Sequence, residues 1–385
     1  MGVIRAEPAR VSDWAAKSVG AAWRAFDLQL MTYAGLLVAV GLVMGYTNSI
    51  ESGSAPLSAG TTFSRGLMWA GIAVIVFIIA TAFDYHWLKT LSWPIYGLQL
   101  GLLMLTLVVG DGVGGSARWV SVGPLTFQFS EIAKILMIIV LANYLARRQG
   151  QLDSPAPILG ACLLVAPPML LVVVQPDLGT SLVFGAILAG MLFLSGASLR
   201  WLTALAVVVI AAVPIVWTYV LHDYQKQRLI SFLDPAADPQ GSGFQLVQSQ
   251  VAVGSGGLAG KGLTNGTQDS SLLPVQTTDF VFAKLGEELG FIGALVVFVL
   301  FIALIWRLLV AAWRSEDPFG MLVAAGVASM ILFQFVVNVG MVIGVMPITG
   351  IPLPFVTHGG ASLISLAFGL GLVQSINIRQ MRAEW

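Results

Sequence analysis

The stretch APILGACLLVAPPMLLVVVQPDLGTSLVFGAILAGMLFLSG, residues 156–196, is apolar from end to end except at one point. A helix needs about 20 mostly apolar residues to cross the hydrocarbon core of a bilayer, so the stretch is long enough for two crossings. The polar break is QPD at 175–177, where proline ends the first helix. We therefore predict a membrane hairpin with helices over 156–174 and 178–196.

Apolar runs of similar length recur along the whole chain. Of its 385 residues, 57% are hydrophobic and 10% are charged, whereas soluble domains carry roughly 25% charged residues. The stretch 319–378 divides at a proline-rich MPITGIPLP. We predict an all-α polytopic membrane protein, 1–385, that forms a single transmembrane domain of about ten helices. The predicted spans are 28–46, 65–83, 91–109, 131–146, 156–174, 178–196, 200–221, 280–306, 319–346 and 355–378.

The distribution of cations orients these helices. Cytoplasmic loops of membrane proteins carry an excess of Lys and Arg. With the N-terminus inside, every short inner loop contains a cation, and most of the 19 Lys and Arg residues fall on that side. We expect both termini in the cytoplasm, with a cytoplasmic leader over 1–27 and a long extracytoplasmic loop over 222–279. A long polar loop on an apolar scaffold is a typical place for function. The net charge of +0 gives no basic field for nucleic acid.

The long loop contains a glycine-rich motif, GSGGLAGKG at 254–262, that superficially resembles a phosphate-binding loop. A P-loop needs Gly five residues before the Gly-Lys pair and Ser or Thr after it. Those positions hold Ser255 and Gly262 here, and the predicted face has no ATP. The glycines are better explained by tight turns or by close approach to a ligand.

The segment GGSARWVSVGPLTFQFSEIAK precedes and opens one predicted helix, and it allows two interpretations. In the first it anchors the protein at the membrane surface, with Arg118 and Trp119 at headgroup level, Ser130 capping the helix and Glu131 paired with Lys134. In the second it clamps an anion, because arginine offers a planar fork and lysine a point charge for phosphate oxygens.

Two acids lie at predicted helix starts on the outer side. Asp177 follows QP in the hairpin, and Asp279 stands in QTTDFVFAKLGEELG. Each could cap its helix. An acid at the membrane boundary also calls for a cationic or metal partner, and oxygen ligands of this kind suit Mg²⁺. Lys284, Glu287 and Glu288 are spaced for i,i+3 and i,i+4 contacts on the following helix. These residues favour an outward-facing polar cavity for an anionic, phosphate-bearing lipid.

Five collinear segments resemble the SEDS proteins (shape, elongation, division, sporulation), the RodA/FtsW/SpoVE group of bacterial envelope enzymes. They are ARWVSVGPLTFQFSEIAK, QPDLGTS, FLDPAADPQGSGFQLVQSQVAVGSGGLAGKGL, TTDFVFAKLGEELG and PLPFVTHGGASL. The resemblance runs from about 30 to 378, and DYHWLKTLSWPIYGLQL at 84–100 looks more like RodA than FtsW. The chain departs from the family at QFSE, usually Gln-Pro-Ser-Glu, and at THGG, often Ser-Tyr-Gly-Gly.

The resemblance implies a glycosyltransferase of the bacterial cytoplasmic membrane that polymerises lipid II into glycan strands at the outer face, for cell elongation and shape. It implies a class B penicillin-binding protein as partner. The family's catalytic acid corresponds to Asp279, and Arg118, Lys134 and Asp177 match other functionally important positions. The predicted substrate-binding set is Arg118, Trp119, Glu131, Lys134, Asp177 and Lys284.

The chemistry agrees with this interpretation. A sugar hydroxyl that attacks an anomeric carbon needs a base, which Asp279 can supply. A leaving diphosphate needs cations, which arginine, lysine or a bound Mg²⁺ can supply. A lipid-linked-sugar flippase would use the same cavity but would need access from the inner face, and a non-catalytic scaffold would not need these charges. Polymerisation of lipid II by the purified protein distinguishes the three.

Overall fold

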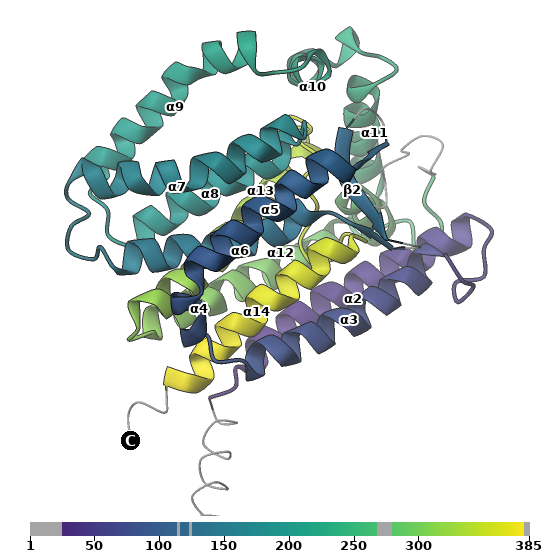
Figure 1. Ribbon diagram of the computed structural model, residues 1–385. Coiled ribbons are helices and arrows are strands. Elements are labelled where there is room, and N and C mark those ends of the chain that lie inside the picture. The colour runs from purple at the N-terminus through teal and green to yellow at the C-terminus, as the bar shows by residue number, and fades with distance from the viewer. Residues whose placement is uncertain (1–24, 114–115, 123–124, 268–278, 381–385) are drawn as a thin grey trace, which may run out of the picture.

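The computed structural model describes residues 25–113, 116–122, 125–267 and 279–380, and it is an elongated bundle of helices (Figure 1). Most of the predicted leader lies outside the described residues. The long helices are α2 (Leu28–Glu51), α3 (Thr62–Ala82), α5 (Ser92–Val109), α6 (Phe129–Ala146), α7 (Pro155–Val174), α8 (Leu178–Leu194), α9 (Leu199–Tyr219), α12 (Val281–Arg314), α13 (Pro318–Val342) and α14 (Gly360–Gln380).

The predicted all-α membrane architecture is confirmed. Within the described residues, 9 helices are long and apolar enough to cross a membrane, and α8, at 17 residues, is a shorter apolar helix. The predicted hairpin is present: α7 ends at Val174 and α8 begins at Leu178. Proline forces this break because it lacks a backbone N–H and clashes with the preceding turn.

The bundle has a protein-covered centre and a lipid-covered rim. Most of the span is buried in α6, α13 and α14. In α9, by contrast, no residue is buried among the described side chains, and Figure 1 shows it standing away from the other helices. A helix that is apolar all round and exposed in this way is suited to contact with membrane lipid.

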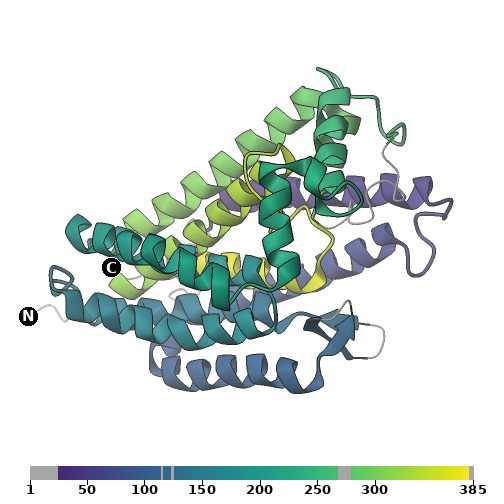
Figure 2. The same cartoon turned by 90° about the horizontal axis from the view of Figure 1, so that it is seen from above.

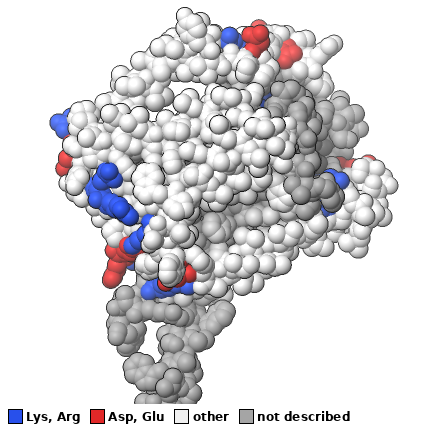
Figure 3. Space-filling model, viewed as in Figure 1, with Lys and Arg blue, Asp and Glu red and all other residues white. Residues whose placement is uncertain are grey.

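The two ends of the bundle differ. The terminal end is where α2 begins and α14 ends, together with the short helix α4 (His86–Thr90) (Figure 1). The sheet end carries a three-stranded antiparallel sheet of β1 (Asp111–Val113), β2 (Ser116–Val122) and β3 (Leu125–Phe127). On the face shown in Figure 3, charged side chains gather near the ends and a broad surface between them is almost without charge. That pattern matches a membrane-spanning band.

The segment expected as a long loop is largely helical. It forms α10 (Asp223–Leu233), a 3₁₀ turn η1 (Pro235–Ala237) and α11 (Ser242–Ser255) at the sheet end, while 268–278 lie outside the described residues. Helix α11 packs on α12 and α13, as the view from above shows (Figure 2). The Ser249 hydroxyl donates to the Val342 carbonyl at 3.0 Å. The expectation of a loop was wrong here because helices were located by long apolar runs, and α10 and α11 are too short and too polar to form such a run.

The glycine-rich motif lies against a break in α12. The break is at Gly290, whose φ of 66° and ψ of −164° are not helical. The Phe291 N–H donates to the Gly257 carbonyl at 2.9 Å, and the Lys261 N–H donates to the Glu287 carbonyl at 2.9 Å. A side chain at Gly260 would collide with the α12 backbone. The close approach expected of these glycines is therefore to the protein's own backbone, where it satisfies groups freed by the break.

Candidate active site

Asp279 lies at the sheet end, one residue before the residue that caps α12. That cap residue is Phe280, so Asp279 lies one position before the N-cap, and a capping role for its side chain stays a prediction. The buried Asn338 amide of α13 donates to the Asp279 carbonyl at 2.9 Å and to the Ile351 carbonyl at 2.8 Å. One side chain thus holds the start of α12 against the turn that precedes α14.

Gly350 brings an acid and a cation together. A methyl group in place of its hydrogen would lie 3.4 Å from Oδ2 of Asp279 and 3.7 Å from Nη1 of Arg228. Its φ of +71° also disfavours any larger residue. The turn around Gly350 therefore places the carboxylate of Asp279 and the guanidinium delivered by α10 over one small patch of backbone.

Arg118 joins three elements at the same end. Its Nε donates to the Gln175 carbonyl at 3.2 Å, and its Nη2 donates to the Pro176 carbonyl and to the Tyr224 hydroxyl, the latter at 3.1 Å. The two carbonyls terminate α7, where a helix presents partial negative charge. The arginine of β2 is therefore fixed between the hairpin break and α10.

A cavity of about 70 Å³ opens between these elements. Arg118, Tyr224 and Arg228 line one side, and the turn that includes Thr349 lines the other. The same turn touches α8, because a side chain at Gly179 would meet the Thr349 carbonyl. Two guanidinium groups therefore line one cavity next to the Gly350 turn, an arrangement suited to an anion with several oxygens.

Asp177 caps α8, as one of the two sequence interpretations predicted. Its Oδ1 accepts from the Thr180 N–H at 3.1 Å and its Oδ2 from the Gln128 amide at 3.0 Å. The predicted cap at Ser130 is wrong: α6 is preceded by Gln128, and no described side chain caps it. Among the described residues, no three His, Cys, Asp or Glu side chains gather as metal ligands. Both oxygens of Asp177 accept a hydrogen bond, and Mg²⁺ at this end stays a prediction.

Glu131 and Lys134 form the predicted pair, but the pair is buried. Their side chains are 5% and 1% exposed, and Nζ lies 2.7 Å from Oε1. The Ser365 hydroxyl of α14 donates to the Glu131 carbonyl at 2.8 Å. The pair lies inside the protein at the α6 start and does not line the arginine cavity.

Lys284 lies in a second buried cluster. Its Nζ is 3.5 Å from Glu288, the predicted i,i+4 partner, and 2.5 Å from Glu51 at the end of α2. The adjacent Glu287 instead pairs with Lys261 of the glycine-rich motif at 2.6 Å. These ion pairs tie α2 and the glycine-rich segment to the first half of the broken helix.

Sequence reasoning missed four residues of this region. Arg228 is one cation of the KQR group at 226–228, and no spacing links it to an acid 51 positions later. Tyr224 carries no motif, and Glu51 sits in a short connection. Asn338 did carry a signal, because a polar side chain inside the apolar run of α13 needs a protein partner. Trp119 remains at the rim, 38% exposed.

Three comparisons place this geometry among known proteins. The FtsW/RodA/SpoVE family model, described as "Cell cycle protein", matches residues 27–382. Peptidoglycan glycosyltransferase MrdB of Escherichia coli K12 is 44% identical over 294 residues, which cover 74% of this chain and 78% of that protein. Stage V sporulation protein E of Bacillus subtilis 168 is 37% identical over 358 residues, covering 91% and 96%.

Two solved structures have the same fold. A chain of a structure described as "Structural coordination of polymerization and crosslinking by a peptidoglycan synthase complex" superposes with a TM-score of 0.77 at 31% identity, covering 92% of this chain and 98% of that one. The rod shape determining protein RodA of Thermus thermophilus superposes with a TM-score of 0.68 at 29% identity, covering 93% and 98%.

Proposed function

The chain belongs to the FtsW/RodA/SpoVE family and is a peptidoglycan glycosyltransferase, and we propose that Asp279 is the carboxylate at which its reaction takes place. One observation carries the proposal: the side chains of Asp279 and Arg228 both approach Gly350, beside a cavity that Arg228 and a second guanidinium, that of Arg118, line. An acid and two cations at one end of a membrane bundle match a reaction between a sugar hydroxyl and a diphosphate-linked sugar.

The proposed step is a displacement at the anomeric carbon of lipid II. The acceptor sugar's hydroxyl oxygen forms the new bond to that carbon, and its proton passes to the Asp279 carboxylate. The bond between the anomeric carbon and the diphosphate oxygen breaks, and the diphosphate leaves with the electron pair. Positive charge that develops on the donor sugar is stabilised by the nearby carboxylate, as in other glycosyl-transfer sites.

The guanidinium groups of Arg118 and Arg228 receive the leaving diphosphate in this proposal. Charge-assisted hydrogen bonds from arginine to phosphate oxygens are short and can be bidentate. Mg²⁺ stays a prediction, and no step is assigned to it here. Lys134, Glu131 and Lys284 are buried, and we assign them to holding α6 and α12 in place around the substrate.

The reaction test uses the purified full chain and purified lipid II. We expect glycan strands to form, and the chain not to transport lipid II across vesicle membranes. Transport without polymerisation would instead favour the flippase function. No polymerisation by a folded chain, alone or with its partner, would overturn the catalytic proposal.

We propose that the chain lies in the bacterial cytoplasmic membrane with the terminal end inside. The cation distribution supports this orientation. Gln240→Cys at the exposed sheet end is expected to react with a membrane-impermeant thiol reagent added outside cells, and Glu316→Cys at the terminal end is not. Wild type, whose one cysteine is Cys162 in α7, is the control. Labelling of both variants from outside would overturn the orientation.

We also propose a class B penicillin-binding protein as partner. Support comes from a structural neighbour that belongs to a complex coordinating polymerisation and crosslinking. Exposed apolar helices such as α9 offer surface for a partner's membrane helix. Co-purification in mild detergent with increased polymerase activity is the expected result. Full activity of the lone chain with no detectable complex would contradict a required partner.

A further inference from the structure

A second cavity lies at the terminal end, far from Asp279 along the bundle. It has a volume of about 820 Å³ and opens between α5, α6 and α7. Its lining includes Ser92, Trp93, Tyr96, Arg147, Arg148 and Gln151. The size falls within the range of small-molecule sites, roughly 300–1,000 Å³. The proposed polymerisation step uses none of these residues.

The cavity has preformed walls. Pro168 inside α7 has no N–H to give to the Leu164 carbonyl four residues earlier. The Tyr96 hydroxyl of α5 donates to that carbonyl at 3.0 Å instead. On the other wall the Tyr144 hydroxyl of α6 donates to the Pro157 carbonyl at 3.1 Å. Hydrogen bonds from both neighbours therefore fix α7, so a ligand meets a site that is already organised.

Among the described residues, two arginines in the lining have no acidic partner. Arg147 donates through Nε to Asn143 at 3.2 Å. Arg148 stacks over the Tyr144 ring, with its guanidinium carbon 3.8 Å from the ring centre. Neither forms an ion pair with any acid in the described ranges. Three other cations of the same end do have one.

These three cations have a structural role, because each lies next to a carboxylate. Lys89, Arg307 and Arg379 face carboxylates at 2.7, 2.6 and 3.6 Å. The two cavity arginines differ because they line an open cavity with aromatic side chains beside them. Tryptophan and tyrosine at this depth are typical of the bilayer interface.

We propose that this cavity binds the headgroup of an anionic phospholipid, with Arg147 and Arg148 on its phosphodiester. Basic pockets between membrane helices bind such headgroups. The guanidinium fork matches phosphate oxygens, and Trp93 and Tyr96 flank the glycerol and upper acyl chains. The exposed Gln151 amide offers hydrogen bonds to headgroup hydroxyls. The site is independent of the role assigned to Asp279.

The test is native mass spectrometry of the delipidated full chain in neutral detergent, titrated with dioleoylphosphatidylglycerol. Each arginine near anionic lipid contributes about 1 kcal/mol, so Arg147→Gln/Arg148→Gln is expected to bind on the order of thirtyfold more weakly. Arg314→Gln is the matched control, because Arg314 is a cation of the same end that does not line the cavity. It should bind as wild type does.

Binding measurements with other ligands and with a second double variant identify the class of ligand. Dioleoylphosphatidylcholine should bind wild type weakly, and millimolar inorganic phosphate should not displace phosphatidylglycerol. Arg147→Lys/Arg148→Lys keeps the charge and loses the fork, so binding about three- to tenfold weaker than wild type is expected. Equal binding by wild type and the Gln variant would overturn the proposal. So would preferential binding of undecaprenyl diphosphate, which would mark a carrier-lipid site.

Discussion

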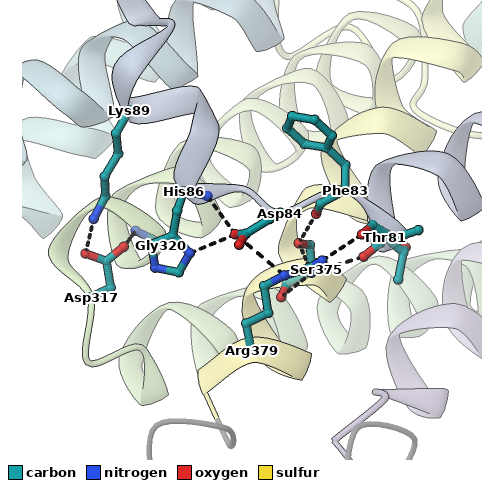
Figure 4. Close-up of polar contacts among 10 residues, drawn as sticks. Thr81, Phe83, Asp84, His86, Lys89, Asp317, Gly320, Ser375 and Arg379 are labelled. Carbon is teal, nitrogen blue, oxygen red and sulfur yellow. Dashed lines mark hydrogen bonds and ion pairs between the residues drawn. The ribbon is translucent and has the colours of Figure 1, made fainter. Parts of the chain in front are cut away.

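Charge is handled differently at the two ends of the molecule. At the terminal end, Figure 4 shows a partly exposed set: Asp84 accepts from the His86 ring at 2.8 Å, and Lys89 donates to Asp317 at 2.7 Å. Arg379 lies 3.6 Å from Asp84. The side chain of Asp84 is 44% exposed. These contacts fasten α4 and the ends of α13 and α14 where water and lipid headgroups can screen them.

At the sheet end several charges are buried. Lys284 and Glu288 are 2% and 0% exposed, and Lys134 is as deeply buried. Burying an ion pair costs desolvation energy that the pairing barely repays, and such pairs add little net stability. We infer that these pairs serve to fix the relative positions of the helices that carry them. The comparison indicates that partly exposed ion pairs hold neighbouring elements together at the terminal end, whereas buried ion pairs fix the positions of helices at the sheet end.

Asp279→Asn should have the largest effect. Asn keeps the shape but cannot accept the hydroxyl proton, so polymerisation of lipid II should fall by roughly 10²–10⁴-fold while the melting temperature stays near wild type. Asp84→Asn, at the terminal end, is the matched control and should remain active. Near-normal glycan synthesis by a stable Asp279→Asn protein would move the catalytic role to another acid.

Breaking one ion pair at each end tests whether a buried pair affects the free energy of unfolding more than a partly exposed pair does. Lys284→Met leaves Glu51 and Glu288 without their cation, and should lower the free energy of unfolding by roughly 3–5 kcal/mol. Lys89→Met breaks a partly exposed pair and should cost about 1 kcal/mol or less. Thermal unfolding in detergent gives both values. Equal losses would show that burial does not distinguish the two ends.

Arg228→Ala and Arg118→Ala test the anion cavity. Losing a charged contact to phosphate should reduce polymerisation by about 1.5–3 kcal/mol in transition-state free energy, or roughly 10- to 150-fold. Arg379→Ala, a cation of the opposite end, is the control for general loss of charge. Wild-type rates in both cavity variants would assign Arg118 and Arg228 to anchoring only.

The smallest expected effect is a pH dependence at the terminal end. Burial acts to raise the pKa of Asp84, but hydrogen bonds from His86 and the charges of His86 and Arg379 outweigh it, and the pKa is lowered. A lowered folded-state pKa adds stability that is present above the unfolded value, about 3.9, and is lost as the pH falls through the folded value. Asp84→Asn should therefore melt slightly below wild type at pH 7. The difference should shrink as the pH falls below about 4; a difference that stays constant into acid pH would contradict this origin.

Local rules in the sequence determined a large part of this protein. Hydropathy located the spans, and proline at 176 divided α7 from α8, because both effects act within a few residues. Helical spacing predicted the contacts of Lys134 with Glu131 and of Lys284 with Glu288. Family resemblance supplied the role of Asp279, and the capping of α8 by Asp177 was one of two interpretations that the sequence left open.

Only the tertiary structure decided which distant residues meet. Glu51 pairs with Lys284 across 233 positions, and Arg228 and Asp279 both approach Gly350, which has no side chain to fill the space beside them. The glycine-rich motif packs against the backbone of α12 at the break at Gly290. Propensity and hydropathy act between neighbours in the chain, whereas a carboxylate and a guanidinium from separate helices are brought together only by how those helices pack.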